Sequence, residues 1–229
     1  TYTASGDTRD MTVDEKRDPQ ALPMPRYWVK GTEVIRQLEP NQRWQLSYRR
    51  FGPSTNERSI IAKFSPVLGL GDSEFITYPS DATTAQACKL LQNFNTYVFD
   101  YVARSKIGST NVNFFILKQL PVLPPTTYTP HTSHFIPPRV LELTYTAWDM
   151  QPFARDLGYN GPPFIWDDER RFWLRAELDA LYFHLYGIGR DDVAYIMETF
   201  PIVKRKDEAK YGHYRTKEAI LELYDEMAR

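Results

Sequence analysis

The stretch YRRFGPSTNERSIIAKF, residues 48–64, places a polar loop between two segments in which apolar and polar side chains alternate. Alternation with a period of two predicts half-buried β-strands, and the Gly-Pro-Ser-Thr-Asn run between them is typical of a turn. The loop also carries three guanidinium groups, on Arg49, Arg50 and Arg58. The stretch therefore predicts a strand–loop–strand unit whose loop is rich in hydrogen-bond donors.

Similar short runs lie on both sides of this unit. RYWV (26–29), RWQLSYRR (43–50) and EFITYP (74–79) are rich in β-branched or aromatic residues and are separated by Gly, Pro, Ser and Asn clusters. We expect each of them to be a strand. NFFILKQL, residues 113–120, is interpreted as a further strand that the prolines after it bring to an end.

From Asp81 onward the apolar spacing becomes helical. We expect a helix capped by Ser80 or Asp81, interrupted near residues 93–95 and ended at Gly108. Residues 121–166 are rich in Pro, Thr and aromatic side chains and are interpreted as a long connector.

Within the connector we expect one short helix at about 138–145. After it, the spacing predicts three helices. The first has an acidic first turn of Asp167, Asp168 and Glu169, and Asp191 and Thr216 are expected to cap the other two. The fold class is therefore predicted to be α+β, a mixed α/β lobe followed by a mainly helical C-terminal region. Four parts are expected: a flexible N-terminal arm (1–25), the lobe (26–125), the connector (126–166) and a helical tail (167–229).

Composition narrows the class of protein. No apolar run is long enough to span a membrane and the N-terminus has no signal-peptide core, so we expect a cytoplasmic protein without a membrane partner. Cys88 is the only cysteine, which excludes a disulfide framework and a cysteine-based zinc site. The chain begins with Thr and a polar segment, which suggests a piece of a longer protein. The net charge is −1, but residues 26–118 carry +5, which favours a basic face in the middle of the chain.

Catalytic motifs are missing from the sequence. It has neither the glycine loop nor the Asn-Pro-Pro-Tyr type clamp of a DNA methyltransferase, and the nuclease-like spacing of Glu208 and Lys210 falls in a polar run. His131 and His134 could share a metal ion but have no further nearby ligands, so we expect a surface loop there and no metal site. Whether the chain is an enzyme is left open.

Two polar clusters carry the remaining chemistry, the first at residues 49–58 and the second at 104–113. Guanidinium groups bind phosphates and guanine edges, amides can read adenine, and hydroxyl groups bond to either. The candidate DNA-binding residues are Arg49, Arg50, Ser54, Thr55, Asn56 and Arg58 in the first cluster and Arg104, Lys106, Ser109, Thr110, Asn111 and Asn113 in the second.

Specific roles follow from side-chain shape. We expect at least one base reader among the three arginines of the first cluster, Asn56 or Asn111 as an adenine reader, and Lys106 as a phosphate contact. The alternative is that these residues serve ordinary turns, with Arg58 pairing with Glu57 or another carboxylate to hold the loop.

A resemblance supports the DNA interpretation. FNTYVFDYVARSKIGSTNVNFFILKQLPVLPP (94–125) resembles the C-terminal half of the target recognition domain in type IIG-like restriction-modification enzymes, which are N6-adenine DNA methyltransferases that include phage-defence proteins. PRYWV (25–29) and YRRFGPSTNERSIIA (48–62) are similar to that domain's opening strands. The run from Ala176 to Met227 resembles the helical tail of the same proteins.

The resemblance implies that residues 26–125 are a target recognition domain for double-stranded DNA, in a fragment that is not catalytic by itself. The parent protein is then expected to be a site-specific adenine methyltransferase, with or without endonuclease activity. It would bind S-adenosylmethionine in a separate methyltransferase domain, and no cofactor is expected in this chain. The alternative from another class is a protein-interaction or scaffolding module that docks a partner subunit.

Overall fold

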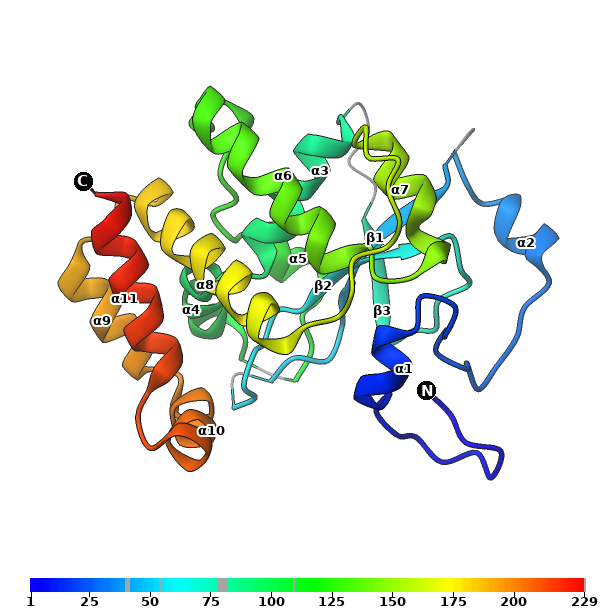
Figure 1. Ribbon diagram of the computed structural model, residues 1–229, viewed down its shortest axis with the longest axis horizontal. Helices are drawn as coiled ribbons and strands as arrows, with labels where there is room; N and C mark the ends of the chain where they lie inside the picture. The colour runs from blue at the N-terminus through cyan, green and yellow to red at the C-terminus, as the bar shows by residue number, and fades with distance from the viewer. Residues whose placement is uncertain (40–41, 54, 78–81, 109, 229) are drawn as a thin grey trace.

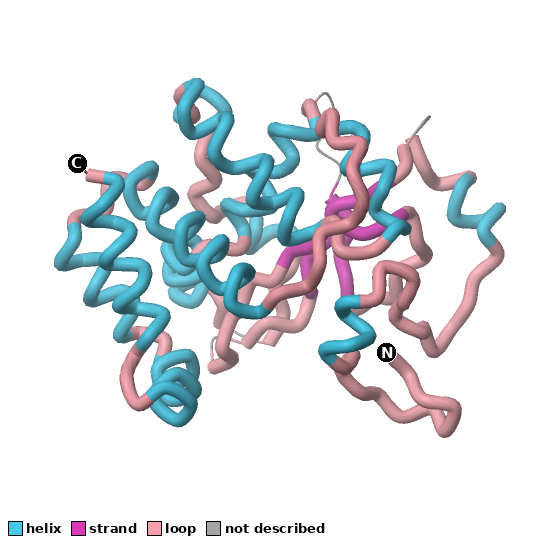
Figure 2. Tube along the Cα trace, in the orientation of Figure 1, coloured by secondary structure: helices cyan, strands magenta, loops and turns pink. Residues whose placement is uncertain are grey.

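The computed structural model describes residues 1–39, 42–53, 55–77, 82–108 and 110–228. It shows an α+β fold in which a small antiparallel sheet is followed by a mainly helical C-terminal region, as the sequence predicts. Figure 1 shows the sheet between the C-terminal helices on one side and the N-terminal segments on the other. Figure 2 shows that most of the structure around the strands is helix and loop.

The sheet has three strands in the described residues, in the order β2-β1-β3. They are β1 (Trp44–Arg49), β2 (Ala62–Pro66) and β3 (Glu74–Thr77), and both neighbours run antiparallel to β1. Leu46 lies opposite Phe64 on β2 and Thr77 on β3. The interior of β1 is buried throughout, because the central strand is covered on both faces.

Two segments predicted as strands are not strands. Residues 26–29 lie outside the sheet, because a strand needs a partner for its backbone groups and no strand of the described sheet pairs with them. Residues 113–120 contain a short helix, α5 (Phe114–Leu117), followed by turns. This turn of helix buries the consecutive residues Ile116 and Leu117 together, whereas a strand would point them to opposite faces.

The helical segment after the sheet is divided where the sequence predicts. α3 (Thr84–Phe94) and α4 (Tyr97–Lys106) are separated by a short turn, and α4 ends two residues before Gly108. The predicted caps Ser80 and Asp81 lie outside the described residues. Thr83 caps α3: its hydroxyl accepts a hydrogen bond from Gln86 N at 3.2 Å, and the Gln86 side chain accepts one from Thr83 N at 2.7 Å.

The predicted connector contains more helix than the expected single short one. The elements are η1 (Pro125–Thr127), α6 (Pro130–Thr144), η2 (Trp148–Met150) and α7 (Gln151–Asp156). α6 begins at Pro130, in the first turn, where the missing N–H of proline has no cost.

Two further prolines, Pro137 and Pro138, lie inside α6, and an interior proline usually costs about 3 kcal/mol. Ile136 and Val140 from the same helix are 0% and 1% exposed. α6 packs against α3 and α8 (Asp168–Leu185). Burial of this face against two helices offsets the proline penalty, and tertiary packing of this kind is not visible in a local sequence pattern.

The C-terminal region consists of α8, α9 (Arg190–Glu198), α10 (Pro201–Tyr211) and α11 (Arg215–Met227). Asp167, which we expected in the acidic first turn, is the N-cap of α8 and accepts a hydrogen bond from Arg170 N at 2.8 Å. α9 begins after Gly189 and α11 after Tyr214, so the predicted caps Asp191 and Thr216 lie inside the first turns. α10 is a helix that the sequence analysis did not predict.

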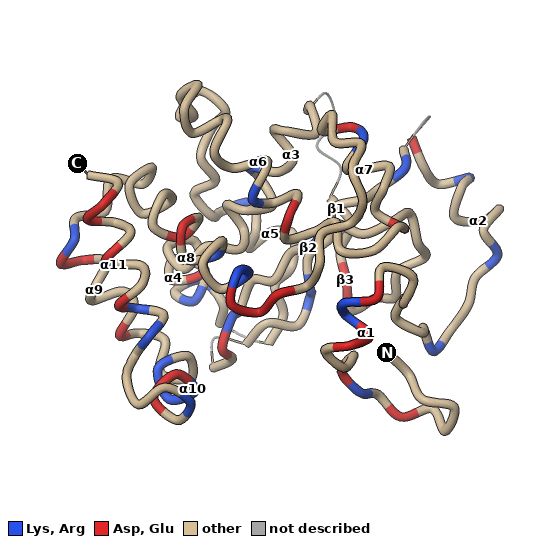
Figure 3. Tube along the Cα trace, viewed as in Figure 1, with Lys and Arg blue, Asp and Glu red and all other residues tan. Residues whose placement is uncertain are grey.

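α10 was not predicted because its polar composition gives no apolar helical spacing, although its boundaries carry ordinary helix signals. Pro201 occupies the first turn, and Gly212 ends the helix with φ of 80°, a conformation that favours glycine. Figure 3 shows acidic and basic residues interleaved along α10 and α11. Of α10, only Val203 and Asp207 are buried, so the run is a solvated helix rather than a loop.

The N-terminal 39 residues include two five-residue helices, α1 (Val13–Arg17) and α2 (Gly31–Ile35). Segment 1–25 contacts the rest of the molecule near Trp148 and Trp166. Trp148 N donates a hydrogen bond to Pro19 O at 3.1 Å, Arg17 Nε donates one to Trp166 O at 3.4 Å, and Lys16 Nζ lies 5.0 Å from the centre of the Trp166 ring. The buried apolar residues of the sheet, α3, α4, α8, α9 and α11 form one continuous core.

Candidate nucleic-acid interface

The two polar clusters, far apart in the sequence, lie side by side in the structure. Gly52 N donates a hydrogen bond to Thr110 O at 3.0 Å, and Val112 N donates one to Arg50 O at 2.7 Å. Phe51 and Asn111 form an isolated antiparallel bridge between the same two segments. The paired clusters therefore present one continuous surface. Ser54 and Ser109, one candidate from each cluster, lie outside the described residues.

Gly52 makes the close folding of the first cluster possible. A Cβ atom at this position would lie 1.8 Å from the carbonyl oxygen of Ser59. Ser59 Oγ donates a hydrogen bond to Pro53 O at 3.2 Å, and Asn56 N donates one to Pro53 O at 3.0 Å. The loop is thus folded back on itself so tightly that only glycine fits at residue 52.

A buried carboxylate on α4 holds the far end of this loop. Asp100 is 0% exposed, and its Oδ1 accepts hydrogen bonds from the backbone N–H of Ser59 at 3.0 Å and of Ile60 at 2.9 Å. Buried carboxylates persist when they are hydrogen-bonded and paired with opposite charge. Sequence analysis did not identify Asp100, although an acid four residues before Arg104 on a largely apolar helix face is a signal for a buried ion pair.

Arg58 and Arg104 supply that opposite charge. The Nε atom of each guanidinium lies 3.5 Å from Asp100 Oδ2, and the two side chains are only 18% and 13% exposed. Arg58 stacks on Tyr97 at 4.1 Å from the ring centre, and Arg104 stacks on Phe200 at 4.2 Å. Arg104 Nη2 also donates to Asn56 O at 2.7 Å and to Glu57 O at 2.9 Å. Both arginines are occupied in holding the loop to the core.

Burial dominates the titration of the groups around this ion cluster. It raises the pKa of Tyr97 to about 12, against the opposing charge of Arg58. Burial lowers the pKa of Arg104, partly opposed by the charge of Asp100. Arginine remains protonated at neutral pH despite such a shift, so Asp100 stays between two positive charges.

Arg49 and Arg50 lie nearer the surface. Arg49 Nη2 donates to Arg58 O at 3.4 Å. Arg50 forms an ion pair with Asp72, whose side chain is 82% exposed, and its guanidinium lies 5.5 Å from the centre of the Phe51 ring. An exposed pair of this kind is worth about 1 kcal/mol or less, so Asp72 is easily displaced from Arg50.

The remaining candidates form the accessible part of the paired clusters. Thr55, Lys106 and Thr110 are exposed, and Asn56, Asn111 and Asn113 are half-buried. Phenylalanines that the sequence analysis did not select lie in or beside the clusters: Phe51, Phe114 and Phe115 are 44%, 43% and 63% exposed. The adjacent pair Phe114 and Phe115 was interpreted as part of a strand, which would have buried one of them.

Several basic side chains of the middle segment are paired with acids, most of which belong to the same segment and are already counted in its +5. Besides the ion pairs of Arg50, Arg58 and Arg104, Arg43 pairs with Asp156, and Lys63 Nζ lies 2.8 Å from Glu74 Oε1. Figure 3 shows acidic and basic residues in both halves of the molecule. At the paired clusters, the positive charge that remains available is carried by Arg49 and Lys106, which form no ion pair with another described residue, and by Arg50 once Asp72 is displaced.

Other candidate chemistry finds little support in the described part of the chain. No group of three or more His, Cys, Asp or Glu residues there could hold a metal ion. His131 and His134, expected on a loop, lie on α6, and Glu208 and Lys210 lie on α10. His184 is packed, with its ring stacked on that of Tyr224 at 3.8 Å. No helix formed by the described residues combines the length and apolar character needed to cross a bilayer.

Comparisons with known proteins found no match to this chain. No family model matches the chain, and neither a curated protein nor a solved structure matches it.

Proposed function

We propose that the chain is a double-stranded DNA target recognition module of a larger restriction-modification or phage-defence N6-adenine methyltransferase. The observation that carries the proposal is the backbone pairing of Gly52 with Thr110 and of Val112 with Arg50, which joins the two polar clusters into one surface. Hydroxyl, amide and cationic groups gathered on one surface are the chemistry that contacts phosphates and base edges. The resemblance of residues 94–125 to the target recognition domain of these enzymes supports the same family.

In this proposal the module itself is not catalytic. The methyltransferase domain of the parent chain is its partner and binds S-adenosylmethionine, and the DNA duplex lies between the two domains. The contact set is smaller than the sequence suggested, because Arg58 and Arg104 face Asp100. Lys106, Thr110 and Thr55 would contact the backbone, while Arg50, Asn56 and Asn111 are the candidate base readers.

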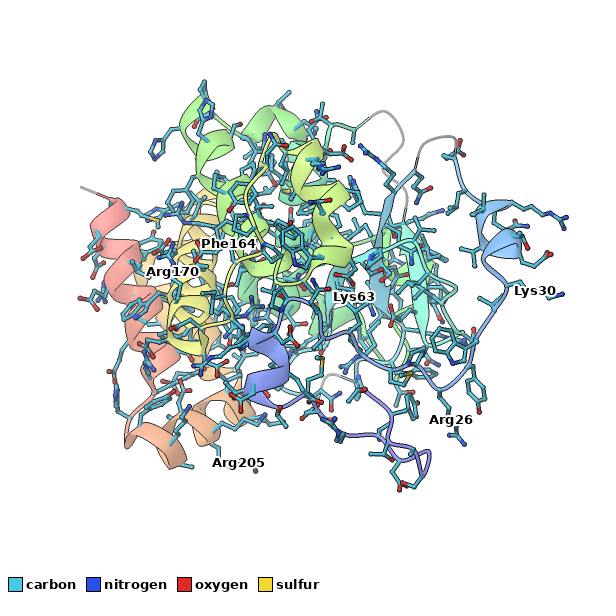
Figure 4. All side chains as sticks on the ribbon, turned by 45° about the vertical axis from the view of Figure 1, so that its right-hand side comes forward. Arg26, Lys30, Lys63, Phe164, Arg170 and Arg205 are labelled. Carbon is cyan, nitrogen blue, oxygen red and sulfur yellow. The ribbon has the colours of Figure 1, made fainter. Side chains whose placement is uncertain are left out.

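Duplex binding at a series of salt concentrations tests the proposal. The logarithm of the affinity should fall linearly with the logarithm of salt concentration, because each phosphate contact releases condensed counterions. Lys106→Ala should lower the slope by about one and weaken all sequences about equally. The matched control is Lys30→Ala, which removes the same charge at the N-terminal side of the molecule, as Figure 4 shows.

Either of two results would contradict the proposal. One is that the chain at low salt binds duplex no better than a neutral control protein. The other is that Lys30→Ala lowers the salt slope as much as Lys106→Ala does, which would indicate diffuse charge attraction rather than an interface at the paired clusters. Binding by the isolated chain is expected to be weak, since the parent's methyltransferase domain would supply further contacts.

A second candidate function is docking of a partner protein. The segment around residues 22–29 exposes Leu22, Met24, Tyr27, Trp28 and Val29, each more than half exposed. Large apolar side chains gathered on one exposed segment are typical of protein contact sites. A partner bound through these residues would be lost on Trp28→Ala, and its affinity would change little with salt, in contrast to DNA binding.

A further inference from the structure

An open cavity of about 750 Å³ lies between the outer edge of β2 and helix α8. The turn between α3 and α4 and the ends of α6, α10 and α11 complete its walls. Glu57 and Arg58 are among its lining residues, but the exposed residues of the paired clusters are not. Its volume lies in the range of about 300 to 1,000 Å³ that is typical of small-molecule sites.

One polar side chain near the C-terminal end of α3 has no partner in the described residues. Asn93 donates to Tyr186 Oη at 2.7 Å and accepts from Leu123 N at 2.9 Å. Asn95 accepts from Ala62 N and donates to Ala62 O, both at 2.9 Å. These two amides are fully used in joining the turn to its neighbours.

Gln92, in the last turn of α3 directly before Asn93, differs. It is 5% exposed and lines the cavity, yet its side-chain amide makes no hydrogen bond to another described residue. Its oxygen and nitrogen are therefore available to a ligand in the cavity that both donates and accepts hydrogen bonds.

Asp179 on α8 contributes a carboxylate to the same cavity. It is 4% exposed, and Oδ1 accepts a hydrogen bond from Tyr97 N at 2.7 Å. Among the described residues, no hydrogen-bond donor approaches the other oxygen, Oδ2, within bonding distance. A nearly buried carboxylate with one unused oxygen favours a ligand that presents N–H groups.

Arg175 lies one helical turn before Asp179, at the exposed end of the cavity wall. Its guanidinium forms no ion pair within 4 Å in the described structure, whereas Arg58 and Arg171, which also line the cavity, are engaged. The side chains of Phe64, Tyr97 and Phe172 give the cavity aromatic walls. The available groups are thus an amide and a carboxylate inside, aromatic sides, and a guanidinium at the mouth.

We propose that this cavity binds a guanine nucleotide. Guanine presents two adjacent N–H donors, N1–H and N2–H, which match the unused oxygen of Asp179, and its O6 and N7 acceptors match the Gln92 amide. Adenine presents an acceptor at N1, which would face the carboxylate unfavourably. The aromatic walls bury the base, and Arg175 pairs with the phosphate at the mouth. This site is separate from the proposed DNA interface and does not depend on it.

Calorimetric titration of the chain with GMP, AMP and inorganic phosphate tests the inference. GMP should bind at least tenfold more tightly than AMP, and phosphate alone should bind far more weakly than either. Asp179→Asn should abolish the preference for GMP, because the side-chain oxygen that accepts from Tyr97 N is kept while an NH₂ group faces the guanine donors. Gln92→Leu should weaken GMP and leave phosphate unchanged.

Arg175→Ala provides a second, surface-located test that does not disturb the core. It should weaken GMP at least tenfold and leave the affinity for guanosine, which lacks phosphate, within twofold. Arg205→Ala on α10 is the matched control: Arg205 is exposed, does not line the cavity, and points away from the molecule in Figure 4. Equal affinity for GMP and AMP, or no binding of GMP at millimolar concentration, overturns the inference. So does an Arg205 variant as impaired as the Arg175 variant.

Discussion

The carboxylate of Asp100 on α4 binds the backbone N–H of Ser59, 41 residues earlier in the chain, at 3.0 Å. This contact joins the helical part of the molecule to the loop between β1 and β2. It also explains why Arg58 and Arg104 turn inward, because both lie 3.5 Å from the same carboxylate. One buried acid, Asp100, therefore fixes the position of the loop that forms part of the proposed DNA interface.

Asp100→Ala should destabilise the protein by about 3 to 5 kcal/mol, because it leaves two buried guanidinium groups and two backbone N–H groups without their partner. Urea denaturation measures the loss. Asp100→Asn should cost less, since the amide oxygen still accepts from Ser59 N. Asp192→Ala, which removes an exposed acid from the first turn of α9, should cost under about 1 kcal/mol. Similar losses for the Asp100 and Asp192 alanine variants would contradict the anchoring role.

Gly52→Ala should cost about 1 to 3 kcal/mol and loosen the first cluster, because the added Cβ would lie 1.8 Å from the Ser59 carbonyl oxygen. Gly108→Ala is the matched control within the second cluster. No atom lies within 4 Å of its added Cβ, so its stability should stay within about 0.5 kcal/mol of the wild type. Thermal unfolding of both variants decides the point, and equal midpoints would show that the loop relaxes around the extra methyl group.

Elements with strong local periodicity were predicted from the sequence. The alternation in 43–50 gave β1, and the leucine spacing after Asp167 gave α8. Predictions failed where a distant partner decides the structure. Residues 26–29 have strand composition but no strand to pair with, and α6 tolerates two internal prolines because its apolar face packs on α3 and α8.

In the candidate site, too, local features were predicted from the sequence and features that depend on distant residues were not. Both polar clusters were identified from composition, but their backbone pairing depends on contacts between residues more than fifty positions apart. Sequence alone does not distinguish an arginine that faces solvent from one that faces a buried acid. Arg58 and Arg104 were selected with Lys106, and only the position of Asp100 separates them. The unpartnered amide of Gln92 left no trace in the sequence.

Neutralising Asp72 should raise DNA affinity if Arg50 contacts DNA. Asp72 is the ion-pair partner of Arg50 and is mostly exposed, so it competes with DNA for the guanidinium. Asp72→Asn should tighten duplex binding severalfold at low salt, Arg50→Ala should weaken it, and the double variant should lose the gain. Fluorescence anisotropy measures all three.

The control for this test is Glu33→Gln on α2, which removes the acid paired with Arg36 at 3.3 Å, on the N-terminal side of the molecule. If it tightens binding as much as Asp72→Asn does, the gain is a net-charge effect and Arg50 has no specific contact. If Arg50→Ala relaxes the sequence preference at one base pair, Arg50 reads a base; a uniform loss over all sequences indicates a phosphate contact.

Asp179 should make stability fall as pH rises through the range from about 4 to 6. Burial raises its pKa from 3.8 to about 6, although the charge of Arg58 and the hydrogen bond from Tyr97 N act in the opposite direction. The folded protein therefore binds more protons than the unfolded chain in that range, and ionising the carboxylate above pH 6 costs the folded state up to about 3 kcal/mol.

Asp179→Asn isolates this contribution because its amide does not titrate. At pH 4, where the buried acid is protonated, the wild type and the variant should differ least in their free energy of unfolding. Between pH 4 and pH 7 the variant should gain up to about 3 kcal/mol relative to the wild type, with most of the change complete by pH 7. Urea denaturation at each pH measures the difference. A difference that stays constant with pH, or that changes in favour of the wild type, would mean that Asp179 is ionised at no cost, held by Arg58 as a stable ion pair.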